Sequence, residues 1–149
     1  MNEKITLQID SGIYLKGKIR FEEIINSIKS NPKIEEVGSI LTFTGIVRKS
    51  SEDGRLVNGL IIDSYEELAN KTIGRICSDI LKEEGIIDLR IIHLIGEFSI
   101  SEDLVYVVVA SAHRKEGFQA LSTAVERYKK ELSVWKKELY LDSEPKWIH

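Results

Sequence analysis

Basic residues stand at two points of the chain where an anion could bind. Arg48 directly follows the apolar segment 39–47. His113 and Arg114 follow the apolar segment 104–112 and open a stretch of helical periodicity. A helix start offers free N–H groups and a positive dipole end, which suit a phosphate. The alternative is that His113 caps the helix and Arg114 is solvated.

Two lysines farther along could carry proton transfer or nucleophilic chemistry. Lys129 lies near the end of the predicted helix, and Lys136 lies in the apolar segment that follows. A short turn between helix and strand would bring the two amines together. A neighbouring cation and partial burial both lower the pKa of an amine, which then acts as a base or nucleophile. Glu138 shares the strand face of Lys136 and could orient it. The alternative is that these are ordinary surface residues.

Charge is unevenly distributed along the chain. The whole chain has 21 basic and 24 acidic residues, a net charge of −3. Residues 113–137 include seven basic and three acidic residues, so the remainder of the chain is strongly acidic. An acidic protein with one basic segment is a poor general binder of nucleic acid, which requires many phosphate contacts. The pattern favours a compact anion pocket or a solvated helix face.

Composition narrows the class of protein further. At 149 residues, 42% apolar and 30% charged, the chain is typical of one soluble globular domain, residues 1–149. The run 104–112 is too short for a membrane helix, and no apolar leader follows the first residue, so we expect a cytoplasmic protein. Cys77 has no partner for a disulfide, and the three histidines lack ligand spacing, so no metal site is expected. The common nucleotide-binding, zinc-protease and serine-hydrolase motifs are absent.

The apolar periodicity predicts an α+β fold, with helices packed on one face of a mostly antiparallel sheet. The predicted helices are 21–28, 66–84 and 115–132, and the predicted strands are 5–9, 39–47, 60–65, 86–95, 104–111 and 134–141. Gly45 marks a bulge or a close backbone approach. Residues 48–55 are predicted to form an exposed loop, with either Asp53-Gly54 or Asn58-Gly59 making the turn.

Each long helix shows one apolar stripe that should face the sheet. The first stripe is Ala69, Ile73, Ile76 and Ile80, and Cys77 flanks it as a core residue rather than a nucleophile. The second stripe is Phe118, Leu121, Val125, Tyr128 and Leu132. Lys129 lies off this second stripe.

Several motifs together resemble one known family. They are the segment 37–48 (VGSILTFTGIVR), Tyr65, His93 with Gly96, the segment 111–118 (SAHRKEGF), Lys129, the segment 135–138 (WKKE) and Trp147. In order and spacing they are similar to the large, catalytic subunit of molybdopterin synthase, from about residue 34 to 147. The resemblance implies the family's α/β hammerhead fold, with two long helices on one face of the sheet.

The resemblance also implies a reaction and its partners. Sulfur would pass from the C-terminal Gly-Gly thiocarboxylate of a small ubiquitin-like subunit to cyclic pyranopterin monophosphate, which forms the dithiolene of molybdopterin. Two large subunits would form a homodimer within a heterotetramer, without a metal or redox cofactor. By this resemblance Lys129 and Lys136 would be catalytic, while Arg48, His113 and Arg114, together with Glu138, would bind the substrate.

Three positions depart from the family pattern. Leu94 replaces a common arginine, Ser133 replaces a common proline, and the sequence ends at His149, before a basic residue that some members carry. None of the residues assigned to catalysis is lost. The alternatives are a non-catalytic dimeric module that binds a ubiquitin-like tail, and a structural dimer that binds only inorganic anions.

Overall fold

The computed structural model describes residues 8–141 and 144–148, which build one seven-stranded sheet and its helices. The sheet order is β2-β5-β4-β3-β6-β7, with β1 paired to β4. Only the β1–β4 pair is parallel. In chain order the elements are β1 (Gly12–Leu15), α1 (Phe21–Lys29), a 3₁₀ helix η1 (Ile34–Glu36), β2 (Ser39–Ile46), β3 (Val57–Ser64), α2 (Glu66–Leu81), β4 (Ile86–Ser99), β5 (Asp103–Ser111), α3 (Arg114–Glu131), β6 (Val134–Tyr140) and β7 (Lys146–Ile148).

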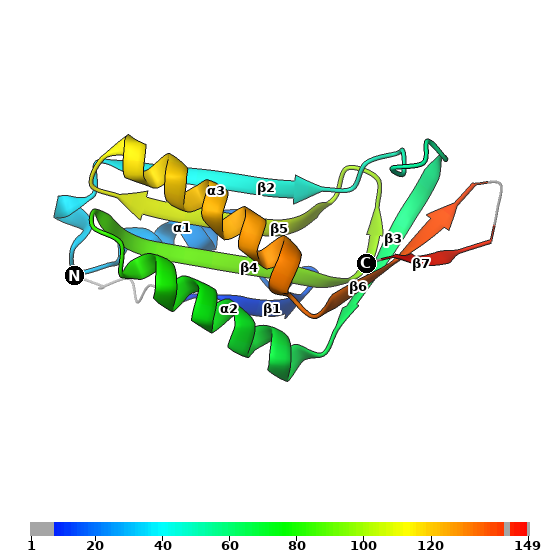
Figure 1. The fold of residues 1–149 in the computed structure, drawn as a ribbon, viewed down its shortest axis with the longest axis horizontal. Coiled ribbons are helices and arrows are strands. Elements are labelled where there is room, and N and C mark those ends of the chain that lie inside the picture. The colour runs from blue at the N-terminus through cyan, green and yellow to red at the C-terminus, as the bar shows by residue number, and fades with distance from the viewer. Residues whose placement is uncertain (1–7, 142–143, 149) are drawn as a thin grey trace, which may run out of the picture.

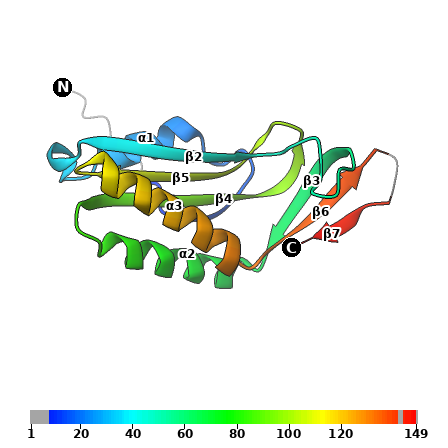
Figure 2. The same ribbon diagram turned by 45° about the horizontal axis from the view of Figure 1, so that its top comes forward.

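The two long helices cover one face of the sheet, as predicted. Figures 1 and 2 show α2 and α3 side by side on that face and α1 on the other. Ile24 and Ile28 of α1 are fully buried, and the Phe21 ring packs against Tyr106 of β5 with 5.6 Å between ring centres. The α+β architecture predicted from the sequence is confirmed, and α1 adds a third layer behind the sheet.

Strand β4 joins two parts of the sheet. Its residues 86–93 pair with β5, and its residues 96–99 pair with β3. Gly96, with φ of +131°, lies where the pairing changes, in a backbone region that side-chain-bearing residues rarely adopt. Lys16, just after β1, donates from Nζ to the Glu97 carbonyl at 3.0 Å and pairs with Glu102 at 2.7 Å. Strands β3, β6 and β7 therefore extend from the main sheet as a wing (Figure 1).

The apolar stripe of α2 packs as predicted. Ala69, Ile73, Ile76 and Ile80 are all at most 1% exposed. Cys77 is buried beside them, and burial raises the pKa of its thiol, which suits a core residue rather than a nucleophile.

The predicted stripe of α3 is confirmed for Tyr128, which is buried, and for Leu121, Val125 and Leu132, which pack against the core, but it is wrong for Phe118. The side of α3 that faces the sheet consists of Gly117, Ala120, Ala124 and Tyr128, whereas Phe118 is 61% exposed. A Cβ atom at Gly117 would lie 2.4 Å from Leu41 Cδ1 and 2.5 Å from Ser111 Oγ. Small residues therefore let α3 lie close to β2 and β5, and the larger Leu121, Val125 and Leu132 pack at the sides.

Other differences from the predicted elements are local. The predicted strand 5–9 lies mostly outside the described residues, and β1 begins later, at Gly12. Strand β4 runs on to Ser99, and β7 was not predicted. The turn forms at Asp53-Gly54, where Gly54 has φ of +84°, while Asn58-Gly59 lies inside β3. The predicted bulge at Gly45 is present, since the β2–β5 register shifts after it. No helix in the described ranges is long and apolar enough to cross a membrane.

The close packing of α3 predicts opposite effects for two glycine substitutions. Gly117→Ala should lower the free energy of unfolding by about 1–3 kcal/mol, because the added methyl group overpacks the interface with β2 and β5. Gly74→Ala on α2 is the matched control. A Cβ there meets no atom within 4 Å, so this change should raise stability by about 0.5–1 kcal/mol. Urea unfolding measures both values, and equal shifts would contradict the packing argument.

Candidate active site

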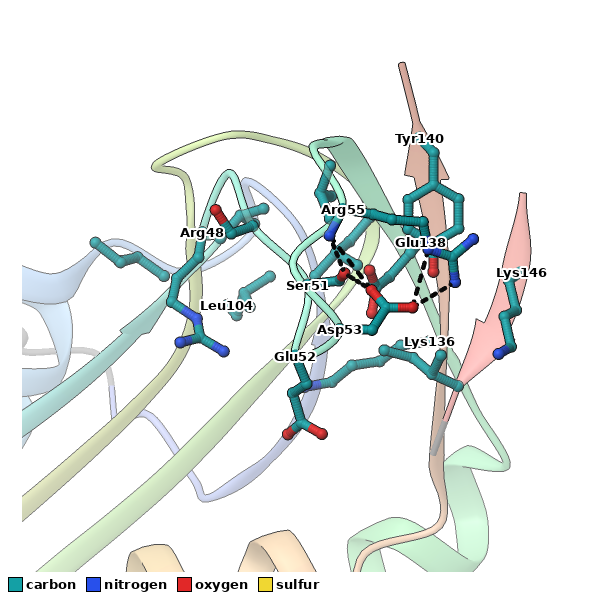
Figure 3. Close-up of a pocket in the computed structure, with 16 residues that line it drawn as sticks. Arg48, Ser51, Glu52, Asp53, Arg55, Leu104, Lys136, Glu138, Tyr140 and Lys146 are labelled. Carbon is teal, nitrogen blue, oxygen red and sulfur yellow. Dashed lines mark hydrogen bonds and ion pairs between the residues drawn. The ribbon is translucent and has the colours of Figure 1, made fainter. Parts of the chain in front are cut away.

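A cavity of about 390 Å³ lies where the wing meets the main sheet, and we call it the main cavity. The loop after β2 lines one side of it, and residues of β6 and β7 line another (Figure 3). Apolar side chains from β2, β3 and β5 also contribute to the lining. Its lining residues are Ile46, Val47, Arg48, Ser50, Ser51, Glu52, Asp53, Arg55, Val57, Leu60, Leu104, Lys136, Glu138, Tyr140, Lys146 and Ile148.

The alternation of β6 determines which of its side chains enter the main cavity. Lys136, Glu138 and Tyr140 line it, as the two-residue period of a strand requires. Figure 3 shows Lys136 extending from β6 toward the loop that carries Glu52. The predicted shared face of Lys136 and Glu138 is therefore confirmed.

Lys136 has an environment that favours its neutral amine. Partial burial lowers its pKa most, the positive charge of Lys129 lowers it further, and Glu138 acts in the opposite direction. Lys129 itself is exposed near the end of α3, with Nζ 5.7 Å from the centre of the Phe43 ring. The helix-to-strand connection therefore brings the two amines into electrostatic contact, as predicted.

The turn between α3 and β6 is anchored to the neighbouring strand. The Ser133 carbonyl accepts a hydrogen bond of 2.9 Å from Ser64 Oγ, at the end of β3. This bond holds the turn at the position where we noted that proline is absent. The spacing between Lys129 and Lys136 therefore has a structural support other than a proline ring.

Glu138 is a buried acid at the centre of the main cavity. It is 7% exposed, and its Oε2 accepts no hydrogen bond from any residue in the described ranges. An unpaired buried carboxylate oxygen is costly. A ligand with a hydrogen-bond donor, or a protonated amine, would remove that cost, so Glu138 is suited to contact a bound molecule or Lys136.

The loop after β2 is held in shape by residues that the sequence did not single out. Arg55 pairs with Asp53, with Nη2 and Oδ2 2.8 Å apart, and its guanidinium carbon lies 4.2 Å from the centre of the Tyr140 ring. Hydrogen bonds from Arg55 and Ser51 keep the pKa of Asp53 well below its usual value. Arg48 precedes this loop and is exposed at the opposite side of the cavity from β6 (Figure 3). The only sequence signal for Arg55 was its place directly after the Asp53-Gly54 turn.

His113 and Arg114 lie in a second hollow at the start of α3, which we call the α3 pocket. It measures about 500 Å³ and is lined by Gly38, Ser39, Ala112, His113, Arg114 and Lys115. His113 occupies the N-cap position, but its side chain makes no capping bond to the helix. Its Nδ1 lies 3.7 Å from Glu116 Oε2 instead. The helix start and its basic residues are thus arranged as predicted, and the capping alternative for the His113 side chain is wrong.

The predicted cations do not converge within one chain. Ser39 in the α3 pocket and Ile46 in the main cavity lie at opposite ends of β2, about 24 Å apart along an extended strand. Arg114 and Lys129 are separated by about 22 Å along α3. Arg48, Lys136 and Glu138 share one cavity with Lys129 nearby, whereas His113 and Arg114 lie at the far end of the sheet. Long, regular elements therefore divide the residues assigned by the resemblance into two groups within one chain.

Two further residues of the family-like motifs are in the interior. His93 on β4 is 3% exposed, its ring stands edge-on to Tyr128 at 5.8 Å, and burial lowers its pKa to about 4. Leu94, which replaces a common arginine, is 3% exposed in the core and lines neither hollow. Within residues 8–141 and 144–148, no three His, Cys, Asp or Glu side chains form a group suited to a metal ion.

The pairing of amines predicts a measurable change at Lys136. Lys129→Met should raise the pKa of Lys136, because the positive charge of Lys129 repels a protonated Lys136 and its removal stabilises that protonated form. The modification rate of Lys136 by an acylating reagent, followed by peptide mass spectrometry from pH 6 to 11, measures this shift. Lys130→Met, at the exposed next position, is the control and should leave the profile unchanged. An unchanged profile in Lys129→Met would show that the two amines are electrostatically independent.

Comparison with known proteins identifies the family to which the chain is similar. The chain matches the MoaE protein family over residues 16–131. It is 38% identical over 127 residues to the molybdopterin synthase catalytic subunit of Pyrococcus abyssi, with 85% of this chain and 82% of that protein covered. It is 35% identical over 133 residues to the protein of the same name from Bacillus subtilis, with coverages of 89% and 81%.

Solved structures agree with the sequence relatives. The crystal structure of molybdopterin synthase from Staphylococcus aureus is similar with a TM-score of 0.78 and 31% identity, covering 93% of this chain and 96% of that one. A chain from the complex of subunits 1 and 2 of molybdopterin-converting factor from Helicobacter pylori shares the fold, with a TM-score of 0.68, 21% identity and coverages of 89% and 90%. On its sequence and its fold, the chain belongs to the MoaE protein family of molybdopterin synthase catalytic subunits.

Proposed function

We propose that sulfur transfer to cyclic pyranopterin monophosphate takes place at the main cavity. Membership of this family makes the chain a sulfurtransferase of molybdenum cofactor biosynthesis. The observation that carries the placement is Lys136, a half-buried amine whose pKa is lowered by burial and by Lys129, beside the buried Glu138. An amine that gives up its proton easily is what acid–base chemistry near neutral pH requires.

The sulfur donor in this proposal is a small ubiquitin-like subunit with a C-terminal Gly-Gly thiocarboxylate. Its sulfur forms a bond to a carbon of the substrate while a carbon–oxygen bond at that carbon breaks, and the departing oxygen takes up a proton. Water then attacks the acyl carbon. The acyl–sulfur bond breaks, the sulfur stays on the substrate, and the tail leaves as a carboxylate. A second donor repeats the transfer. Glycine residues let such a tail enter a narrow site beside the substrate.

Each residue of the main cavity has a role that its surroundings support. Lys136 takes and returns the protons of the attacking water and of the departing oxygen, while Lys129 keeps the pKa of Lys136 low and stabilises negative charge at the acyl carbon. Arg48 binds the phosphate or pterin from the loop side of the cavity. Glu138 orients Lys136 or accepts a hydrogen bond from the pterin.

His113 and Arg114 complete the site from a second copy of the chain. The length of β2 and α3 keeps them more than about 20 Å from Lys136 in their own chain. A twofold dimer relates two identical patches, so the α3 pocket of one copy could meet the main cavity of the other, twice. The substrate's phosphate would then contact Arg114 and His113 of one copy and the lysines of the other. The homodimer is thus part of the catalytic proposal, within a heterotetramer with two small subunits.

We place this reaction in the cytoplasm and treat residues 1–149 as a single functional domain. The continuous apolar core that joins helices, main sheet and wing supports the single domain.

Anaerobic reconstitution tests the proposed function. Wild-type protein, a thiocarboxylated small subunit from the same genome and cyclic pyranopterin monophosphate should yield molybdopterin, measured as its fluorescent oxidised derivative. Lys129→Ala should abolish turnover but leave folding and dimerisation intact, because this side chain is exposed and off the core. Formation of a stable complex without any product would instead support the non-catalytic binding module. Wild-type rates in Lys129→Ala would remove that residue from the mechanism.

Mixing two defective variants tests whether the site spans two copies. Lys136→Ala and the double variant His113→Ala/Arg114→Ala should each be inactive at low substrate concentration. If each site combines residues of both copies, random mixing by unfolding and refolding should restore about one quarter of wild-type activity, since half the dimers are mixed and each has one intact site. Each variant refolded alone is the control. No recovery in a sample shown to contain mixed dimers would place all the residues of a site in one chain.

A further inference from the structure

The β6–β7 hairpin directs one more basic side chain into the main cavity. Glu138 of β6 is paired with Lys146 of β7, and Lys136 is paired with Ile148. Residues directly opposite each other in an antiparallel pair project from the same face. All four line the cavity, and Figure 3 shows Lys146 extending from β7 toward β6.

The alternate residues of the hairpin face the other way. Lys137 is paired with Trp147, and neither lines the main cavity. The Lys137 ammonium lies 5.5 Å from the centre of the Trp147 ring, a cation–π contact on the opposite face of the wing. Lys137 and Lys146 therefore lie in neighbouring residue pairs of the hairpin and carry the same charge, but they project from opposite faces of it.

The positive charges of the cavity differ in how they are compensated. Arg55 forms an ion pair with Asp53 and lies over the Tyr140 ring, so its positive charge is neutralised by a carboxylate of the same loop. Arg48, Lys136 and Lys146 form no ion pair with another residue of the described ranges. An anion that enters the cavity therefore meets the charges of Arg48 and Lys146, together with the Lys136 amine, whose pKa is lowered by burial and by Lys129.

We propose that Lys146 is a further anion-binding residue of this site, whose ammonium holds the anionic end group of a ligand beside Lys136. This inference rests on the proposed function, which supplies two such end groups, the phosphate of the substrate and the thiocarboxylate of the small subunit's tail. A lysine acts on either as a compact point charge with three donors. Glu138, directly across the strand pair, lies on the same cavity face as Lys146.

The role predicts a loss of affinity without a loss of chemistry. Lys146→Gln should raise the KM of one of the two ligands about tenfold and change kcat less than about twofold, since the charge-assisted hydrogen bond that is lost contributes to binding and not to the chemical step. Lys146→Arg should retain most of the affinity. The matched control is Lys137→Gln, which removes the same charge from the same hairpin on the opposite face and should leave both KM values unchanged.

Two titrations identify the ligand that Lys146 holds. KM is measured for cyclic pyranopterin monophosphate with saturating small subunit, and then for the thiocarboxylated small subunit with saturating substrate. A rise confined to the first assigns Lys146 to the phosphate, and a rise confined to the second assigns it to the tail. Unchanged KM values in Lys146→Gln, or equal rises in Lys137→Gln, would overturn the inference.

Calorimetric binding keeps this test independent of turnover. Substrate, and separately the small subunit in its carboxylate form, are titrated into wild-type protein and both glutamine variants, after circular dichroism confirms equal thermal unfolding. Normal binding by wild type and an equal affinity in Lys146→Gln would overturn only the assignment of Lys146. A wild-type protein that binds neither ligand would overturn the proposed function itself.

Discussion

The site depends on one strand that pairs with two sets of neighbours. Strand β4 pairs with β5 and β1 over its first part and with β3 over its last four residues, and the change occurs at Gly96. Because β3 in turn carries β6 and β7, every wing residue of the main cavity is positioned through this short set of backbone hydrogen bonds. Lys16 secures the branch by binding both the Glu97 carbonyl and the Glu102 carboxylate. Without this change of partner, Lys136 and Arg48 would not face a common space.

Charge in this molecule is separated along the sheet rather than concentrated. The α3 pocket has the helix start, His113 and Arg114, while the main cavity has Lys136 with the buried Glu138. The α3 pocket lacks the two lysines, Lys129 and Lys136, and the main cavity lacks the helix N–H groups. In the proposed function a second copy of the chain brings the two groups together, which would link dimerisation to catalysis.

Local patterns in the sequence predicted the features that depend on local geometry. The two-residue period of β6 placed Lys136 and Glu138 on one face, and the short connection after α3 brought Lys129 close to Lys136. Long-range features were not predictable in this way. Phe118 was placed on the buried side of α3 in error, because its neighbour Gly117 faces the sheet instead. The lack of space at Gly117 comes from Leu41 and Ser111, which are distant in sequence. Lys146 was overlooked because β7 is three residues long and acquires its orientation from its register with β6.

The buried carboxylate of Glu138 has a consequence for how the protein balances stability against activity. An acceptor oxygen without a partner lowers the stability of the unliganded fold. A ligand that donates a hydrogen bond to this oxygen removes that cost, so ligand binding should raise the free energy of unfolding of the wing. A substitution that removes the buried polar group, such as Glu138→Leu, would then favour a more stable but less active protein. The unpartnered oxygen of Glu138 thus links the stability of the wing to occupancy of the main cavity.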